Sequence, residues 1–321
     1  MKSSEILLYN KGLFNSIIED LKLEILEPGE TLDDYMKNIS WEEFIELCKT
    51  IYGRKSEITA NTFEYSLAYD SDENFFITKL IQEEIGYSHV GSDEKGIINF
   101  DPDVDDNAFK KAKAYVKQYR EYYDTGFFNT KGTLGTYASN DFKEQKTLFS
   151  VGSSGGAGYN FPAGSAFEVG VCKVPASKNN PQYVNQGLTL TFLKNSKYTD
   201  EMNTSKIRLA WQFAKYITNP SNNVELCLDS QGYLPVRKSA IETKEYQKFL
   251  LKDNDYARTA KVLINEINGR YFTSAVFKGS AELRAQTGAI FTESLLDKGS
   301  DIDAAIDRIF RQHINTAKTK F

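Results

Sequence analysis

The stretch whose residue types point most directly to binding chemistry is the glycine- and serine-rich segment 152–158. It holds four glycines in seven residues, with Ser153 and Ser154 among them. Glycines allow backbone N–H groups to converge on an anion, and the serine hydroxyls add further donors. The segment lacks the Gly-Lys-Ser/Thr ending of a Walker A loop, and no dinucleotide-binding fingerprint fits it. It is therefore either an anion-binding loop or a flexible turn.

Charged residues elsewhere offer two further kinds of chemistry. Asp70, Asp72 and Glu73 stand together in an acidic stretch, and a hydrolytic site needs two carboxylates or a nucleophile with its base. Because neighbours on one loop cannot by themselves flank a scissile bond, a solvated loop or a helix cap is the favoured interpretation. Arg284 could hold a carboxylate or a phosphate with its two-pronged guanidinium, or form an ordinary surface ion pair.

The sequence contains few residues or motifs that could form a metal or cofactor site. There are two histidines, far apart, and the three cysteines Cys48, Cys172 and Cys227 contain no CxxC spacing, so we predict buried free thiols. The acidic run 101–106 resembles the start of a calcium loop but lacks the glycine at the sixth position and the glutamate at the twelfth. We therefore expect neither a metal nor a cofactor.

The composition narrows the class of protein further. A length of 321 residues is typical of two domains or one large one, and 40% hydrophobic residues predict a folded core. The formal net charge of −5 gives no electrostatic footprint for nucleic acid. No apolar run is long enough to span a membrane, and residues 1–11 lack the apolar region of a signal peptide. The sequence alone therefore predicts that the chain as written remains in the cytoplasm.

Apolar spacing predicts strands and helices that alternate without a repeat, which is typical of an α/β fold. A capping box at Ser40-Trp41-Glu42-Glu43 predicts a helix that runs to Gly53. The predicted strands are 5–9, 63–69, 148–151, 168–174 and 188–193. The other predicted helices are 14–25, 75–85, 105–122, 200–217, 223–228, 254–266, 279–296 and 301–317.

Four segments in chain order resemble one family, the extracellular solute-binding proteins of bacterial ABC importers, in the branch that binds sugars and glycerol phosphates. They are KSSEILLYNK at 2–11 followed by Leu13-Phe14, SWEE at 40–43, AWQFAKY at 210–216 with Asn219-Pro220, and GYLPV at 232–236. The likeness is greatest to the glycerol-3-phosphate and glycerophosphodiester binding proteins, which have a Ser-Ser-Gly segment in mid-chain and an arginine late in the chain.

The resemblance implies a type II periplasmic-binding-protein-like clamshell with most of the N-terminal lobe missing. Residues 6–183 and 251–321 would form the C-terminal lobe, 184–250 the remnant of the N-terminal lobe, and 1–5 a hinge strand between them. The complete protein would be extracytoplasmic, in the periplasm or as a surface lipoprotein, and at most peripheral to the membrane. This chain itself shows no signal peptide.

The resemblance also implies a set of ligand-binding residues and a function without catalysis. The set is Ser3, Asn74, Phe75, Ser153, Ser154, Gly155, Gly187, Tyr233 and Arg284, with Phe75 where the family usually has tryptophan. The expected ligand is a small phosphorylated polyol, such as glycerol 3-phosphate or a glycerophosphodiester, delivered to the membrane subunits of an importer. A neutral mono- or oligosaccharide is the first alternative. A cytoplasmic carboxylate-dependent hydrolase, or a folded fragment that binds nothing, are the others.

Overall fold

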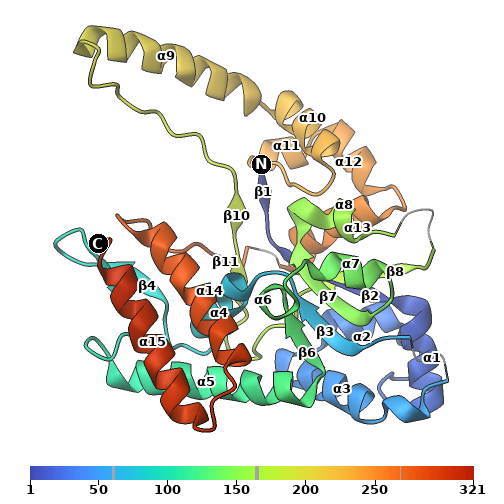
Figure 1. Ribbon diagram of the computed structural model, residues 1–321. Coiled ribbons are helices and arrows are strands. Elements are labelled where there is room, and N and C mark those ends of the chain that lie inside the picture. The colour runs from blue at the N-terminus through green and yellow to red at the C-terminus, as the bar shows by residue number, and fades with distance from the viewer. Residues whose placement is uncertain (60–61, 163–165, 268) are drawn as a thin grey trace.

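A five-stranded sheet organises most of the chain (Figure 1). The computed structural model describes residues 1–59, 62–162, 166–267 and 269–321. In spatial order the strands are β6 (Phe128–Thr130), β3 (Tyr65–Tyr69), β7 (Thr147–Ser153), β2 (Glu5–Asn10) and β8 (Val169–Lys173). Strand β3 is parallel to β6 and β7, whereas β2 is antiparallel to β7 and β8. Helices lie between the strands along the chain, so the predicted α/β class is confirmed.

Strand β2 lies inside the sheet and is buried along its whole length. Successive side chains of a strand point to opposite faces, so Ile6 and Leu8 lie in one hydrophobic core while Leu7 and Tyr9 lie in another. A continuous apolar run of this kind is expected where helices cover both faces of a sheet.

The larger core lies on the Leu7 side and is rich in aromatic rings. Phe75 is fully buried within it, with ring centroids 4.8 Å from that of Tyr119 and 4.9 Å from that of Phe291. Tilted and edge-on contacts such as these are the geometry that aromatic pairs prefer. The helices that supply this core are α1 (Lys11–Leu21), α2 (Leu32–Asn38), α3 (Trp41–Gly53), α4 (Asp72–Gln82), α5 (Asp106–Thr125), α14 (Ser280–Leu296) and α15 (Ile302–Lys318).

The smaller core, on the Ile6 side, is built mainly by short helices. They are α7 (Ala138–Lys143), α8 (Ala157–Asn160), α10 (Pro220–Ser230), α11 (Lys238–Ile241), α12 (Lys244–Leu250) and α13 (Asp255–Lys261), which continues into a π-helical turn at Val262–Glu266. Helix α6 (Lys131–Leu134) follows β6 directly.

Three two-stranded sheets complete the β-structure of the described residues. Strand β4 (Ser88–Val90) pairs with β5 (Gly96–Ile98), and β9 (Tyr183–Val184) pairs with β11 (Tyr271–Phe272). The third sheet joins β1 (Lys2–Ser3) to β10 (Gln186–Gly187), which pair antiparallel and lie between the body and the upper helices in Figure 1.

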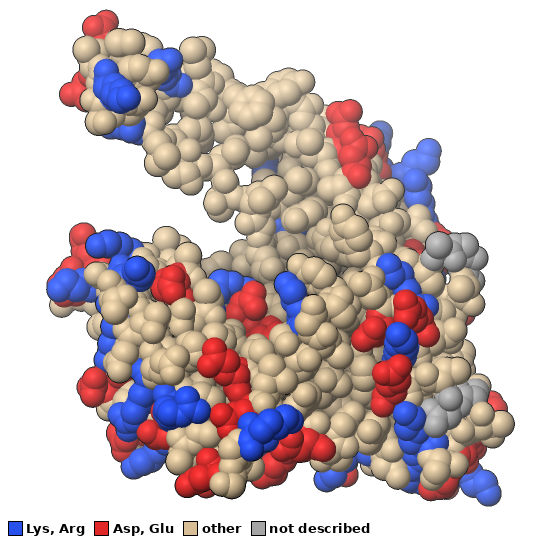
Figure 2. Space-filling view, viewed as in Figure 1, with Lys and Arg blue, Asp and Glu red and all other residues tan. Residues whose placement is uncertain are grey.

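Helix α9 (Asp200–Ile217) occupies the predicted residues but projects from the body as an arm (Figure 1). Three apolar side chains at helical spacing stay exposed on it, with Leu209 at 72%, Phe213 at 59% and Tyr216 at 64%. Between its tip and the body the arm carries few charges (Figure 2). The predicted strand at 188–193 is wrong, because none of the described strands pairs with this segment.

Helix ends account for other differences from the sequence prediction. Helix α1 ends at Leu21 rather than at residue 25, because Lys22 adopts a left-handed conformation with φ of 50°. Helix α4 begins at Asp72, three residues early, because the Ser71 hydroxyl accepts a hydrogen bond from the Asn74 amide. The one-turn helices α6, α8 and α11 escaped prediction because one turn is too short to show an apolar period.

Two sequence predictions, the capping box at Ser40 and the buried free cysteines, are confirmed. The Ser40 hydroxyl accepts from the Glu43 amide at 3.3 Å, and the Glu43 carboxylate accepts from the Ser40 amide at 2.9 Å, which completes the capping box. All three cysteines are buried and free. Within the described ranges, no helix combines the length and apolarity needed to cross a bilayer.

The pairing of Gly170 with Tyr9 across β8 and β2 yields a stability prediction. A Cβ on Gly170 would lie 2.1 Å from the Tyr9 ring, which is fully buried and cannot retreat. Gly170→Ala should lower the free energy of unfolding by about 1–3 kcal/mol, the usual cost of overpacking, as measured by urea denaturation.

Gly53→Ala is the matched control, because a Cβ there meets nothing within 4 Å at the end of α3. It should leave the unfolding midpoint unchanged or raise it slightly. Equal midpoints for the two variants would contradict the packing argument.

Candidate ligand-binding cavity

A cavity of about 700 Å³ opens at the sheet edge where β3, β6 and β7 end. Because β2 runs in the opposite direction, its first residue, Glu5, lies at the same edge. Crevices at the carboxyl ends of strands are the usual ligand sites of α/β sheets. The charged side chains of the lining are Glu5, Asp70, Glu73, Lys131, Lys143 and Arg284.

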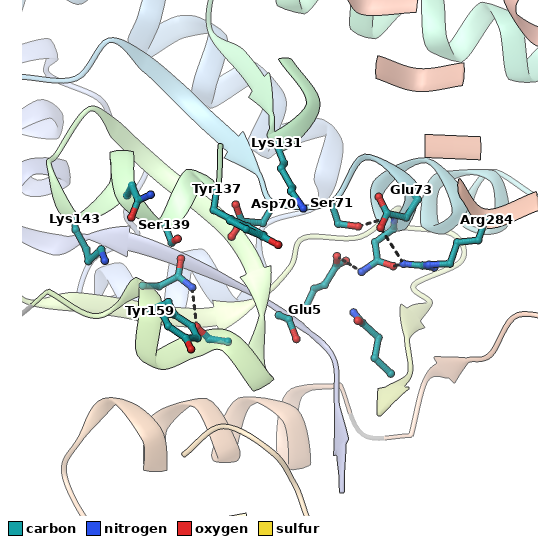
Figure 3. Close-up of a pocket in the computed structure, with 16 residues that line it drawn as sticks. Glu5, Asp70, Ser71, Glu73, Lys131, Tyr137, Ser139, Lys143, Tyr159 and Arg284 are labelled. Carbon is teal, nitrogen blue, oxygen red and sulfur yellow. Dashed lines mark hydrogen bonds and ion pairs between the residues drawn. The ribbon is translucent and has the colours of Figure 1, made fainter. Parts of the chain in front are cut away.

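The cavity is elongated, and its two ends differ in chemistry (Figure 3). Glu73 and Arg284 lie at one end, while Lys143 and Tyr159 lie at the other, with Asp70 between them. Tyr159 is 76% exposed and Tyr137, nearer the middle, is 53% exposed, so both rings are available to a ligand.

Glu5 is the buried carboxylate of the cavity, with only 4% of the residue exposed. It accepts a hydrogen bond from the Asn74 amide nitrogen at 2.8 Å and another from the Tyr69 hydroxyl. Burial raises the pKa of Glu5 to about 7, although these hydrogen bonds and the nearby Arg284 act in the opposite direction.

Asn74 connects Glu5 to Arg284. Its Oδ1 accepts a hydrogen bond from the Arg284 guanidinium, which also lies 3.6 Å from the Glu73 carboxylate. The structure thus brings together Asn74 and Arg284, two of the residues implied by the resemblance, although they are 210 positions apart. Arg284 therefore already has an amide and a carboxylate as partners.

The acidic stretch 70–73 separates into residues with different surroundings. Asp72 is 4% exposed and accepts from the Gly132 amide at 2.8 Å and the Thr292 hydroxyl at 2.9 Å, so it ties α4 to α6 and α14. Asp70 lines the cavity, and its Oδ1 accepts from the Ala138 amide at 2.6 Å. Burial raises the pKa of Asp70 to about 6.

The glycine- and serine-rich segment forms the end of β7 and a tight helical turn. The Ser154 amide donates to the Ser4 carbonyl at 2.8 Å, and the Gly155 amide donates to the Ser153 hydroxyl at 3.2 Å. Ser153 lines the cavity, whereas Ser154 is fully buried. These two amides therefore have protein partners and are not free to bind an anion as they stand.

The other residues implied by the resemblance lie beside the cavity or behind it, outside its described lining. Ser3 and Gly187 belong to the β1–β10 pair. The Tyr233 ring packs on Gly155, where a Cβ would lie 2.6 Å from the ring. Phe75 is buried in the aromatic core behind α4, so its ring forms no part of the cavity wall.

Sequence reasoning missed Glu5, Lys131, Lys143 and the two exposed tyrosines as cavity residues. The sequence does contain a feature that could have indicated Glu5 and Lys131. Glu5 is a lone charge at the start of an apolar strand, and Lys131 follows β6 directly. Lys143 and Tyr159 come from the short helices α7 and α8, for which the sequence offered no such signal.

Burial of Glu5 predicts a distinctive pH dependence of stability. Its pKa of about 7 in the folded chain exceeds its ordinary value of 4.5, so the folded state holds the proton more tightly. The free energy of unfolding should therefore fall as the pH rises from about 4.5 through 7, by up to about 3 kcal/mol from this group. Glu5→Gln should flatten that fall, measured as urea midpoints between pH 4.5 and 8.

Asp70 acts in the same direction, so the slope should shrink rather than vanish. Asn140→Ala, a non-titrating change in the cavity lining, is the control and should keep the wild-type slope. An unchanged slope in Glu5→Gln would refute the role given to this carboxyl.

Solved structures that resemble this chain bind sugars according to their descriptions. The GacH receptor of Streptomyces glaucescens, described unliganded and with acarbose, matches at a TM-score of 0.58 and 17% identity, covering 98% of this chain and 70% of its own. The maltose/maltodextrin-binding domain MalE from Bdellovibrio bacteriovorus, bound to maltotriose, matches at 0.56 and 14%, covering 99% and 71%. The substrate-binding protein Lmo0181 from Listeria monocytogenes, in complex with cycloalternan, matches at 0.59 and 15%, covering 98% and 70%.

These likenesses support the expected clamshell fold, with about three tenths of each neighbouring chain unmatched here. A comparison with curated protein sequences gave no match. The model of one sequence family, described as bacterial extracellular solute-binding protein, matches residues 1–253, most of the chain. The chain therefore belongs to the family of bacterial extracellular solute-binding proteins.

Proposed function

We propose that the cavity captures a neutral mono- or oligosaccharide for delivery to the membrane subunits of an ABC importer. The observation that carries this proposal is the cavity lining, which combines three carboxylates and three cations with two exposed tyrosine rings. Sugar hydroxyls both donate and accept hydrogen bonds, so they suit a lining of mixed charge. The apolar faces of sugar rings can pack on the tyrosines.

A phosphorylated polyol, the first expectation from the sequence, fits this lining less well. Arg284 is already engaged by Asn74 and Glu73, and the amides of Ser154 and Gly155 have protein partners. The three carboxylates of the lining match its three cations in number, so the lining has no excess of cations to favour a phosphate. Acarbose, maltotriose and cycloalternan, the ligands in the descriptions of the structural neighbours, also favour the neutral-sugar alternative.

A hydrolase is not favoured by the same geometry. Asp72 is buried, accepts hydrogen bonds from Thr130, Gly132 and Thr292, and is not part of the described cavity lining, so it is held in the fold rather than presented to a substrate. The family to which the chain belongs consists of binding proteins.

The two-lobed organisation is part of the proposal. Residues 6–183 and 251–321 would form one lobe, 184–250 would belong to a second, and 1–5 would cross between them as the hinge. In this arrangement Ser3, Gly187 and Tyr233 lie between the lobes and Asn74, Ser153 and Arg284 contact the ligand. The arm up to Ile217 stands clear of the body, whereas α10 to α12 also pack in the smaller core. The family description favours an extracytoplasmic location.

Ligand titration tests the proposed function. A binding sugar raises the free energy of unfolding by RT ln(1 + [L]/Kd), about 2.7 kcal/mol at one hundred times Kd. We expect thermal shifts with at least one of maltotriose, cellotriose, mannotriose and xylotriose, and none with glycerol 3-phosphate or glycerophosphocholine. A shift with the phosphates alone would restore the phosphorylated ligand, and no shift with any sugar would refute sugar capture by this chain.

The exposed apolar face of α9 allows a test of the second lobe. If this face awaits a covering lobe, Leu209→Ser combined with Phe213→Ser should leave the melting temperature within about 2 °C, because exposed side chains contribute little. The same change should reduce binding of a hydrophobic dye. Lys215→Ser, at an exposed charged position of α9, should alter neither quantity. A large loss of melting temperature in the double variant would mean that the face is already covered.

A further inference from the structure

Two polar side chains converge over Gly152, a buried glycine near the end of β7. The position that a Cβ would take on Gly152 is 3.2 Å from Asp70 Oδ2 and 3.5 Å from Asn160 Nδ2. Asp70 follows β3, and Asn160 ends α8, so the two groups reach this point from different parts of the chain. Asp70 and Asn160 both line the cavity, and a Cβ on Gly152 would stand in contact with both side chains.

The side chains of Asp70 and Asn160 both have oxygen acceptor positions that no hydrogen bond within the described residues fills. Asn160 is 3% exposed, its Nδ2 donates to the Gly156 carbonyl at 3.3 Å, and its Oδ1 is buried without a hydrogen-bond partner among the described residues. The Asp70 carboxylate accepts from the backbone at Ala138 and Ser139, which occupies about half of its acceptor positions. Buried polar atoms in native proteins rarely stay unpaired, so the space between the pair suits a ligand that brings donors.

The surroundings narrow the chemistry of that ligand. An anion is disfavoured because the Asp70 carboxylate is negatively charged and Asn160 Oδ1 carries a partial negative charge. A cation is disfavoured because Lys131 and Lys143 also line this stretch of the cavity, and Lys131 acts on Asp70 electrostatically. Neutral hydroxyl groups remain, and Tyr137 and Tyr159 supply exposed rings for the sugar face beside them.

We propose that Asp70, Asn160 and Gly152 form a hydroxyl-reading subsite that selects sugars with two adjacent free hydroxyls. One hydroxyl donates to Asp70 Oδ2 and its neighbour to Asn160 Oδ1, while the missing side chain of Gly152 leaves the atoms between these two groups uncrowded. We name these three residues the diol cradle. This inference rests on the proposed function, because it specifies which neutral sugars the cavity accepts.

Calorimetric titration of the full chain with the tightest-binding of the four trisaccharides tests the cradle. Asp70→Asn should weaken binding about ten- to a hundredfold, because one charged acceptor is lost. Asn160→Ala should weaken it about tenfold. Gly152→Ala, whose Cβ would enter the cradle, should weaken binding at least about tenfold without changing any charge.

Gly53→Ala is the matched control, since it makes the same change of glycine to alanine at the end of α3, outside the described cavity lining, and its Cβ would meet nothing within 4 Å. It should change the affinity less than about twofold. The melting temperature of each variant, measured without ligand, separates loss of the fold from loss of the contact.

Deoxy analogues of the same trisaccharide provide a readout that a merely structural role would not move. Removing the hydroxyl that faces Asp70 should cost wild-type affinity about tenfold but cost little more in Asp70→Asn, because the charged acceptor is already gone. Full additivity, or unchanged affinity in folded Asp70→Asn and Gly152→Ala, would overturn the cradle. Absence of sugar binding by the wild-type chain would instead refute the proposed function.

Discussion

The antiparallel insertion of β2 between β7 and β8 is the constraint on which the cavity depends. Because β2 runs against β7, Glu5 pairs with Ser153, the last residue of that strand. If β2 were parallel to β7, its far end, Asn10, would occupy this edge instead. The direction of one strand therefore places a carboxylate from the start of the chain among residues that follow β3, β6 and β7.

A buried carboxylate imposes demands on its neighbours. Removing Glu5 from water is costly unless hydrogen bonds compensate, and Tyr69 and Asn74 supply them. Asn74 can serve both Glu5 and Arg284 because an amide has a donor end and an acceptor end. The result is a polar connection from β2 through α4 to α14, which fixes where the Arg284 guanidinium lies. Arg284 is thus linked to Glu5 through Asn74, and its guanidinium also lies 3.6 Å from the Glu73 carboxylate.

A structural feature could be predicted from the sequence when the residues that determine it are neighbours in the chain. The capping box predicted α3, and the apolar run predicted β2, because the responsible residues are neighbours in the chain. The meeting of Asp70 with Asn160 depends on strand order and on a four-residue helix, and neither leaves a periodic trace in the sequence. The strand predicted at 188–193 is wrong although its sequence pattern is local and clear. Its alternating pattern is that of a strand, but hydrogen-bonded pairing requires a neighbour, and the described chain supplies none.

The arrangement of charges is the physical basis for the proposal that the cavity takes an uncharged ligand, although its lining has many ionic groups. At one end, Arg284 is balanced by Glu73 and Asn74, so little net positive charge is available to an anion. Near the middle, the negative charge of Asp70 is offset by Lys131. With all six charged groups of the lining ionised, the three carboxylates and the three cations leave no excess of either charge. A polyhydroxyl compound meets both kinds of group at once, whereas a phosphate could satisfy only the donors and would leave the Asp70 and Asn160 acceptors unpaired.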